Sequence, residues 1–218
     1  MNAGELLTLF RSEMADAVEP YLWSDEEFYI YLDDAQIRLC RETDGIADAT
    51  TPEVTQLQIV AGQEWYEVDR RIKKLRLATR AADGANVAIF NPETALSKGV
   101  RFNSGSNGRA QVIVWGLETG KVRVWPKPTQ DDLIELSVFR LPLAKVIDED
   151  SALEVDERHH LALLDWVKRR AYLKQDAETL DRNRAADFEA SFDLYCKKVL
   201  REQSRERRST GTTTYGGL

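Results

Sequence analysis

The spacing of apolar residues changes twice along the chain, and this change constrains the fold more than any other feature. Up to about residue 45, and again from about residue 156, apolar residues recur every three or four positions, the period of an amphipathic helix. Between residues 55 and 146 the period is two, which is typical of strands with one buried face. The order α–β–α predicts an α+β fold: a helical bundle built from the N- and C-terminal helices, with an inserted β-rich domain.

These periods divide the chain into four segments. We expect residues 1–54 to hold the N-terminal helices of the bundle and residues 55–147 to form the inserted β-rich domain. Residues 148–208 supply the C-terminal helices of the bundle. Residues 209–218 lack a core-forming pattern, so we expect a flexible tail.

The N-terminal helices are marked by their boundary residues. A first helical stripe, which extends as far as Val18, is ended by Pro20, because proline lacks the backbone donor and restricts the residue before it. Ser24 and Glu27 have the spacing of a capping box, which predicts the start of a second helix that ends near Gly45. Trp23 directly precedes the cap, where an apolar side chain staples the start of a helix.

The middle of the chain predicts strands separated by turns. The apolar run at 112–115 indicates a strand buried on both faces, and the turn at 118–120 leads into a second strand at 122–125. Alternation over 134–138 predicts a half-exposed strand. The stretch 91–109 contains Pro92 and three glycines, so we expect it to be mostly loop, and a loop of this length is usually functional or mobile.

Composition disfavours several classes of protein. The mean hydropathy is −0.44, and no run approaches the roughly 18 apolar residues of a membrane span. The first residues lack the basic and apolar segments of a signal peptide, so we expect no secretion by that route. Cys40 and Cys196 lie in no metal or disulfide motif, which predicts buried free thiols in a reducing compartment.

Charge is distributed unevenly. The chain carries −7 overall, whereas residues 1–53 alone hold thirteen acidic and three basic residues, a net charge of −10. Basic residues concentrate near the C-terminal end, between 197 and 208. This polarity suits a protein whose two ends contact different surfaces, or neighbouring copies of one surface; a solvated helix face is the simpler alternative. The overall acidity argues against general nucleic-acid binding.

No motif for catalysis, a cofactor or a metal emerges. His159 and His160 are adjacent, so on a helix they point about 100° apart and cannot share a metal; we expect a surface pair at a helix start. The glycine-containing loop at 104–108 lacks the ending of a phosphate-binding loop and precedes strand-like residues rather than a helix. We therefore predict no catalytic, cofactor-binding or metal residue and no enzyme, although a distant pair of carboxylates stays open.

Three features together resemble a known family. The phrase Leu-Trp-Ser-Asp-Glu-Glu-Phe at 22–28 opens the second helix. The stretch 121–128, Lys-Val-Arg-Val-Trp-Pro-Lys-Pro, is followed by the strand at 134–138 and by Arg-Leu-Pro at 140–142. A closing pair of helices ends in a basic segment. In these features, which span most of its length, the chain resembles the head–tail adaptor (connector, or head completion) proteins of tailed bacteriophages.

The resemblance implies a structural virion protein in the neck between capsid and tail, made in the host cytoplasm. It implies a homo-oligomeric ring of about twelve copies that docks on the portal protein ring and extends the DNA channel toward a tail or nozzle protein. Double-stranded DNA passes through without specific binding, and neither a cofactor nor a membrane is involved. In that family the C-terminal segment often docks on the portal. The matching positions here are Lys197, Lys198, Arg201, Arg205, Arg207, Arg208 and Tyr215.

The chain departs from that pattern because its last ten residues are rich in Gly and Thr rather than amphipathic, which leaves the docking mode open. Three alternatives also stay open. Another neck component, a stopper or a tail completion protein, is the nearest, but those proteins are dominated by β structure and the helical ends favour an adaptor. An unrecognised hydrolase with an inserted β domain is the second. A DNA-binding regulator that uses the basic C-terminal helix is the third, and it predicts steeply salt-dependent duplex binding.

Overall fold

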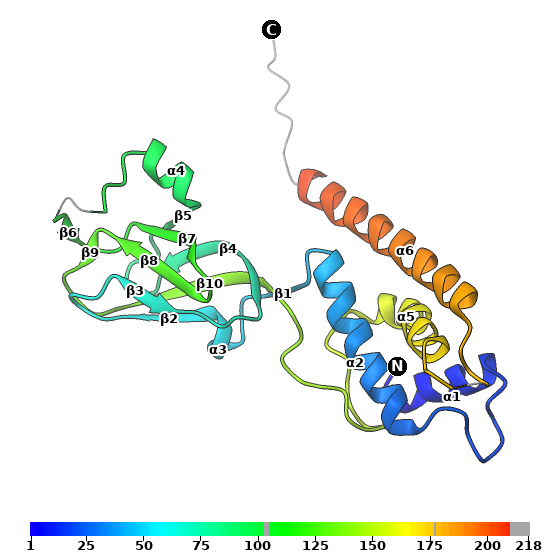
Figure 1. The fold of residues 1–218 in the computed structure, drawn as a ribbon. Helices are drawn as coiled ribbons and strands as arrows, with labels where there is room; N and C mark the ends of the chain where they lie inside the picture. Colours follow the sequence, from blue (N-terminus) through cyan, green and yellow to red (C-terminus); the bar gives the residue numbers. More distant parts are fainter. Residues whose placement is uncertain (103–104, 177, 210–218) are drawn as a thin grey trace, which may run out of the picture. The chain divides into compact units, whose positions relative to one another are not determined.

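A computed structural model describes residues 1–102, 105–176 and 178–209, apart from the side chains of 207–209 (Figure 1). Its described residues form six α-helices: α1 (Ala3–Glu13), α2 (Asp25–Glu42), α3 (Pro52–Thr55), α4 (Pro92–Ser97), α5 (His160–Tyr172) and α6 (Arg182–Ser209), with a 3₁₀ turn at Glu157–His159. They also form ten strands: β1 (Ile46–Asp48), β2 (Gln56–Ile59), β3 (Trp65–Glu67), β4 (Ile72–Arg80), β5 (Ala88–Phe90), β6 (Asn107–Gly108), β7 (Val112–Glu118), β8 (Lys121–Trp125), β9 (Lys127–Pro128) and β10 (Asp132–Arg140). The predicted α+β class is confirmed.

The chain divides into two compact units. The helical unit comprises Met1–Gly45 and the chain from Pro142 onward, and the β unit comprises Ile46–Leu141. The stretch 46–54, which the sequence pattern assigned to the N-terminal helices, contains β1 and most of α3 and belongs to the β unit. The reason is long-range pairing: β1 runs antiparallel to the end of β10, a contact that local periodicity does not reveal.

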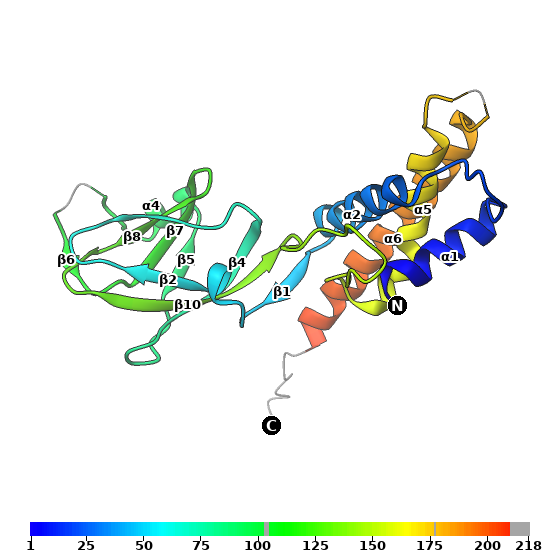
Figure 2. The same ribbon diagram turned by 90° about the horizontal axis from the view of Figure 1, so that it is seen from below.

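In the helical unit, α5 contacts α1, α2 and α6 (Figure 2). The apolar stripes found in the sequence supply most of the core. Its buried side chains include Leu6, Phe10, Phe28, Leu32, Leu39, Leu163, Leu164, Val167, Phe192 and Val199. Each of these four helices buries one stripe against its neighbours, so this part of the fold follows directly from the period of three to four residues.

The first helix ends earlier than the sequence predicted. It stops at Glu13, and Ala15 adopts a positive φ of 54°, which takes the backbone out of the helix well before Pro20. Val18, placed on the helical stripe by the sequence pattern, is 81% exposed. The second helix starts as predicted, because Ser24 and Glu27 form a reciprocal capping box.

The β unit contains two four-stranded sheets and one two-stranded sheet. In the first, β10 pairs antiparallel with β1, β2 and β4; the second has the order β3–β8–β7–β5, in which only the β5–β7 pair is parallel. The two-stranded sheet joins β6 to β9. The inward side chains of the two larger sheets are buried, among them Ile113, Val122, Val124, Ile134 and Leu136. The predicted hairpin at 118–120, and the strands at 112–115 and 134–138, are thereby confirmed.

The stretch 91–109 contains a short helix, α4, that the sequence pattern did not predict. Asn91 caps α4 by accepting a hydrogen bond from the backbone of Thr94, and Pro92 occupies the first turn. Ala95 of α4 packs with Val112 and Val114 in one buried cluster. This short helix therefore covers the second face of β7 at its start, which explains why Val112, Ile113 and Val114 are all buried.

A buried ion pair fixes β1 to β10. Arg140 Nε donates to Asp48 Oδ2 at 2.6 Å, and each residue is only 7% exposed. Burial opposes ionisation of Asp48, but hydrogen bonds from Thr50, Arg140 and Thr51 outweigh it and hold the pKa of the carboxyl below its usual range. The two strands at which the chain enters and leaves the β unit, β1 and β10, are thus joined by an ion pair as well as by backbone hydrogen bonds.

Candidate docking surfaces

The residues most able to support chemistry are used structurally. His160 is buried with Nε2 3.0 Å from the carbonyl of Val155, so the prediction of two surface histidines is wrong for this residue. The half-buried His159 contacts the hydroxyl of Tyr195 through Nδ1 at 2.9 Å. Burial, followed by the charge of Arg158, lowers the pKa of His159. Both histidines therefore tie the start of α5 to its surroundings.

Both cysteines lie in the helical unit. Cys40 and Cys196 are buried and not joined by a disulfide, as predicted, and burial raises the pKa of Cys196 to about 12. Within residues 1–102, 105–176 and 178–209, no group of three or more His, Cys, Asp or Glu side chains is arranged to hold a metal ion. None of the described helices is long and apolar enough to span a membrane.

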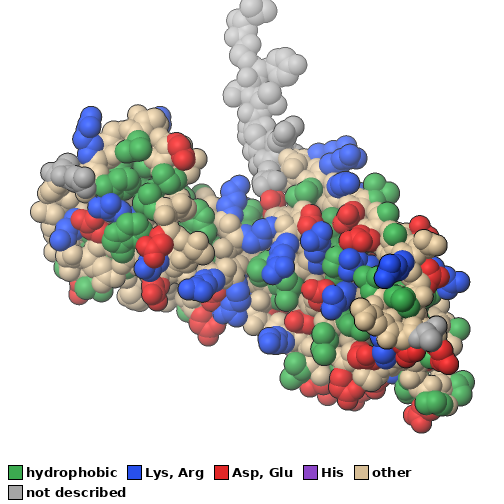
Figure 3. Space-filling view, viewed as in Figure 1, with side chains coloured by type: hydrophobic (Ala, Val, Ile, Leu, Met, Phe, Trp, Pro, Cys, Tyr) green, Lys and Arg blue, Asp and Glu red, His purple; other side chains and the backbone are tan. Residues whose placement is uncertain are grey.

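The strongest surface feature is the basic end of α6, which we define as Lys197, Lys198, Arg201 and Arg205. All four side chains are exposed. The opposite face of the same helix buries Phe192, Cys196 and Val199. Lys197, Arg201 and Arg205 are four residues apart, so they follow one another along a single face. Figure 3 shows basic side chains over this end of α6.

Two of the residues that the resemblance assigned to docking are in the last turn of α6, and one is beyond it. Arg207 and Arg208 are helical, but their side chains lie outside the described residues, as does Tyr215 altogether. The structure therefore places four of the seven candidate residues at one end of α6, while the side chains of the other three lie outside the described residues; the docking role of all seven stays a prediction.

Few of the positive charges at the basic end of α6 are paired with a nearby carboxylate. Lys198 is 4.0 Å from Glu202, one turn further on, and both side chains are well exposed. Among the described side chains, Lys197, Arg201 and Arg205 form no ion pair. Cations near a helix C-terminus interact favourably with the helix dipole, so part of their role is local. The remaining positive potential faces solvent and is available to an acidic partner.

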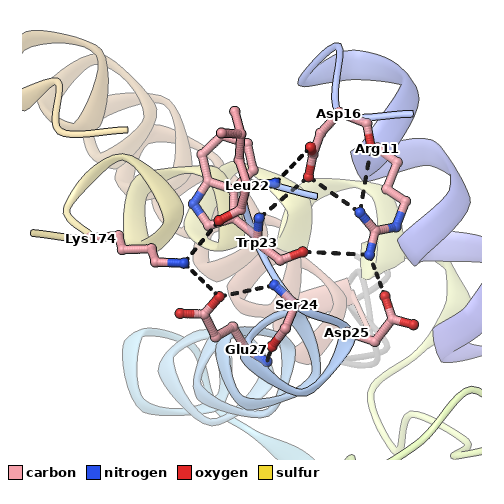
Figure 4. Close-up of polar contacts among 8 residues, drawn as sticks. All are labelled: Arg11, Asp16, Leu22, Trp23, Ser24, Asp25, Glu27 and Lys174. Atoms are coloured by element: carbon pink, nitrogen blue, oxygen red, sulfur yellow. Dashed lines mark hydrogen bonds and ion pairs between the residues drawn. The ribbon is translucent and has the colours of Figure 1, made fainter. Parts of the chain in front are cut away.

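A second surface is the loop between α1 and α2, which is held by polar contacts of Arg11 and Asp16 (Figure 4). Arg11 donates to Asp16 Oδ2 at 3.2 Å and to the carbonyl of Trp23, and it pairs with Asp25. Asp16, only 3% exposed, accepts from the backbone of Leu22 and Trp23. This network fixes both ends of the loop to the helix termini.

The same end of the helical unit is joined to α5. Lys174 Nζ donates to the carbonyl of Leu22 at 2.8 Å and to Glu27 Oε2 at 2.9 Å, and Glu27 also accepts from the backbone of Ser24 (Figure 4). Trp23 Nε1 donates to the carbonyl of Ala171. The Trp-Ser-Asp-Glu-Glu phrase at 23–27 therefore joins the start of α2 to the end of α5, and it holds the C-terminal end of the loop between α1 and α2 in place. We call these contacts the junction around Trp23.

Sequence reasoning found the capping residues of this junction but missed Arg11, Asp16 and Lys174. Lys174 is 152 residues from its partner Leu22, so no local pattern connects them. The tip of the loop carries apolar side chains into solvent, with Val18 and Tyr21 exposed. A rigidly held loop with an apolar tip is a second candidate for contact with another protein.

Comparison with known proteins adds one match. A family model described as SU10 adaptor protein matches residues 1–215, nearly the whole chain. No curated protein matches the chain.

Proposed function

The chain belongs to the SU10 adaptor protein family, a phage head–tail adaptor family, and from this membership we propose that it links the portal ring of a phage head to the tail. Membership confirms the resemblance inferred from the sequence. It makes the chain a structural phage protein and a virion component that interacts with other head and tail proteins. The family is not a class of enzymes.

In the proposed assembly, about twelve copies form a closed ring that docks on the portal and extends the DNA channel through the neck. The helical segments act as one bundle that sits at the portal, with the β unit as an insertion that faces outward or toward the next tail component. The division of the chain into a helical and a β unit supports this assignment. A net charge of −7 suits a channel wall along which DNA slides without being gripped.

Portal docking in this proposal uses the basic end of α6 together with Arg207, Arg208 and the segment that contains Tyr215. The observation that carries it is the row of exposed cations, Lys197, Arg201 and Arg205, none of which forms an ion pair with a described side chain. A polar segment that becomes ordered only on binding suits an assembly step that must wait for its partner.

Light scattering of the chain alone, and then mixed with a candidate portal ring, tests the proposal. We expect the portal to bind about twelve copies. Deletion of residues 209–218 should leave the helical circular dichroism unchanged and weaken attachment. The double variant Lys197→Glu/Arg201→Glu should weaken attachment as well, because it reverses two charges of the docking surface.

The matched control is Lys98→Glu/Lys127→Glu, which changes the net charge equally at exposed lysines of the β unit. It should bind the portal normally. Normal attachment of both the truncated chain and the α6 variant would refute docking through this end. A chain that binds tail proteins but no portal ring would instead be another neck component, a stopper or a tail completion protein.

A further inference from the structure

The β unit carries an exposed basic edge along β4, which we define as Arg70, Lys74, Arg76 and Leu77. All four residues are exposed, and Leu77 retains 64% of its accessible surface. Arg76 lies over the ring of Phe139 at 4.7 Å, which orients its guanidinium on the outer face of the sheet. Among the described residues, Arg70, Lys74 and Arg76 take part in no ion pair. Positive charge and an apolar side chain therefore share one surface.

Two irregularities shape this edge. Leu75 pairs with Val138 and Leu77 with Ser137, which leaves Arg76 as the extra residue of a bulge, and a second shift leaves Lys73 in the same position. Over Ile72–Leu77, β10 is the one described strand that pairs with β4. Bulges and charges on an edge strand discourage the addition of another strand. A partner of this edge is therefore a surface of complementary side chains, not an extended peptide.

The helical unit carries a surface of the opposite character. We define the acidic patch as Glu26, Ile30 and Asp33 of α2 with Ile147, Asp148 and Glu149 of the segment before α5. Asp33 accepts a hydrogen bond from the backbone of Val146, which brings the two segments together. Burial, then the charges of Asp25, Glu149 and Asp148, raise the pKa of Tyr29, so these carboxylates surround one point of α2. Figure 3 shows acidic side chains gathered at the lower margin of the helical unit.

The acidic patch also contains exposed apolar groups. Ile30 and Ile147 are 60% and 70% exposed. Among the described residues, Glu26 and Glu149 form no ion pair with a basic side chain. The acidic patch thus complements the basic edge: it combines carboxylates with exposed apolar side chains, whereas the edge combines cations with one exposed apolar side chain.

We propose that the acidic patch of one copy binds the basic edge of a second copy of this chain. Glu26 and Glu149 face Lys74 and Arg76, and the two isoleucines cover Leu77. The two surfaces differ, so the contact is heterologous and leads from copy to copy in one direction, as a ring requires. The inference rests on the proposed function for the closure of that ring, but the contact itself forms without a portal.

Charge reversal in sedimentation velocity, without a portal, tests the contact. The wild-type chain should self-associate as its concentration rises, and less so at high salt, because the contact joins opposite charges near the surface. The acidic-patch variant Glu26→Lys/Glu149→Lys and the basic-edge variant Lys74→Glu/Arg76→Glu should each weaken self-association at least about tenfold. An equimolar mixture of the two variants should recover association, because each reversed surface then meets its opposite.

Circular dichroism verifies that both variants fold, and Lys98→Glu/Lys127→Glu, at exposed lysines outside both surfaces, is the control, which should associate like the wild type. A wild-type chain that stays monomeric at every concentration overturns the proposal, and so does a mixture that fails to recover association. Equal loss of association in the control would show that overall charge, and not the contact between the two surfaces, causes the effect, and would also overturn it. Failure of portal binding leaves these results unaffected, so the two proposals fail separately.

Discussion

Replacement of Asp48 by Asn is the sharpest test of how the β unit is held together. Asp48 Oδ1 accepts the backbone N–H groups of Thr50 and Thr51 at 2.9 and 3.0 Å, while Oδ2 accepts from Arg140. An Asn side chain retains one oxygen for the two backbone groups. It removes the negative charge opposite the Arg140 guanidinium, which stays buried.

The magnitude follows from burial. Loss of one partner of a buried ion pair costs about 3–5 kcal/mol, because the other charge remains desolvated. Arg140 also donates to the carbonyl of Leu141, so we expect the lower end, about 3 kcal/mol. For a domain of roughly 100 residues this lowers the Tm by about 10–20 °C. The double variant Asp48→Asn/Arg140→Met should recover part of the loss, since it removes both charges.

The same pair makes the stability of the β unit depend on pH, with lower stability at acidic pH. Because the pKa of Asp48 is lower in the folded chain than in the unfolded one, its stabilisation is complete above the unfolded pKa and is lost as the pH falls. The wild-type β unit should lose stability from about pH 5 downward. Asp48→Asn should show a flatter profile over the same range, because it has no carboxyl to protonate.

Calorimetric unfolding measures the stability, and amide hydrogen exchange of β1 and β10 assigns the change to the β unit. Arg38→Gln is a matched control, since it breaks a half-exposed pair with Glu42 in the helical unit and should cost less than about 1 kcal/mol. An Asp48→Asn chain with the stability and pH profile of the wild type would refute the reasoning.

Two further predictions concern the helical unit. Trp23→Ala should lower the free energy of unfolding by about 3–5 kcal/mol in urea titrations, because Trp23 is 3% exposed and packs edge-to-face on Phe10 and Tyr172. Trp23→Phe should cost less, and an unchanged midpoint for Trp23→Ala would contradict burial of this residue. Cys196 should react with a thiol reagent only as the chain unfolds, since it is buried and its pKa is raised to about 12; rapid labelling of the native chain would contradict this.

Much of the fold could be predicted because local patterns and tertiary packing agree. The capping box of Ser24 and Glu27 depends only on residues close in sequence, and so does the alternation of buried and exposed residues in β10. The end of α1 could not be predicted. It depends on the positive φ of Ala15, and alanine, unlike glycine or asparagine, is not a residue type that indicates a positive φ. The helix α4 was missed because its six residues are too few for a periodic signal, and only Asn91 and Pro92 mark its start.

The candidate surfaces were predictable to different degrees. The basic end of α6 follows from a spacing of four residues within one helix, which the sequence displays directly. The junction around Trp23 depends on Arg11, Asp16 and Lys174, whose contacts join separate elements. The basic edge of β4 depends on bulges that rotate its side chains, and bulges leave no periodic trace in the sequence.

The pairing of Ile46 with Arg140 has a consequence for the evolution of such chains. The first and last strand residues of the β unit lie opposite each other, at a Cα separation of about 5 Å in an antiparallel ladder. Loops and strands between them can lengthen, shorten or be exchanged while this gap stays constant. The helical unit then needs no compensating change when the β unit changes.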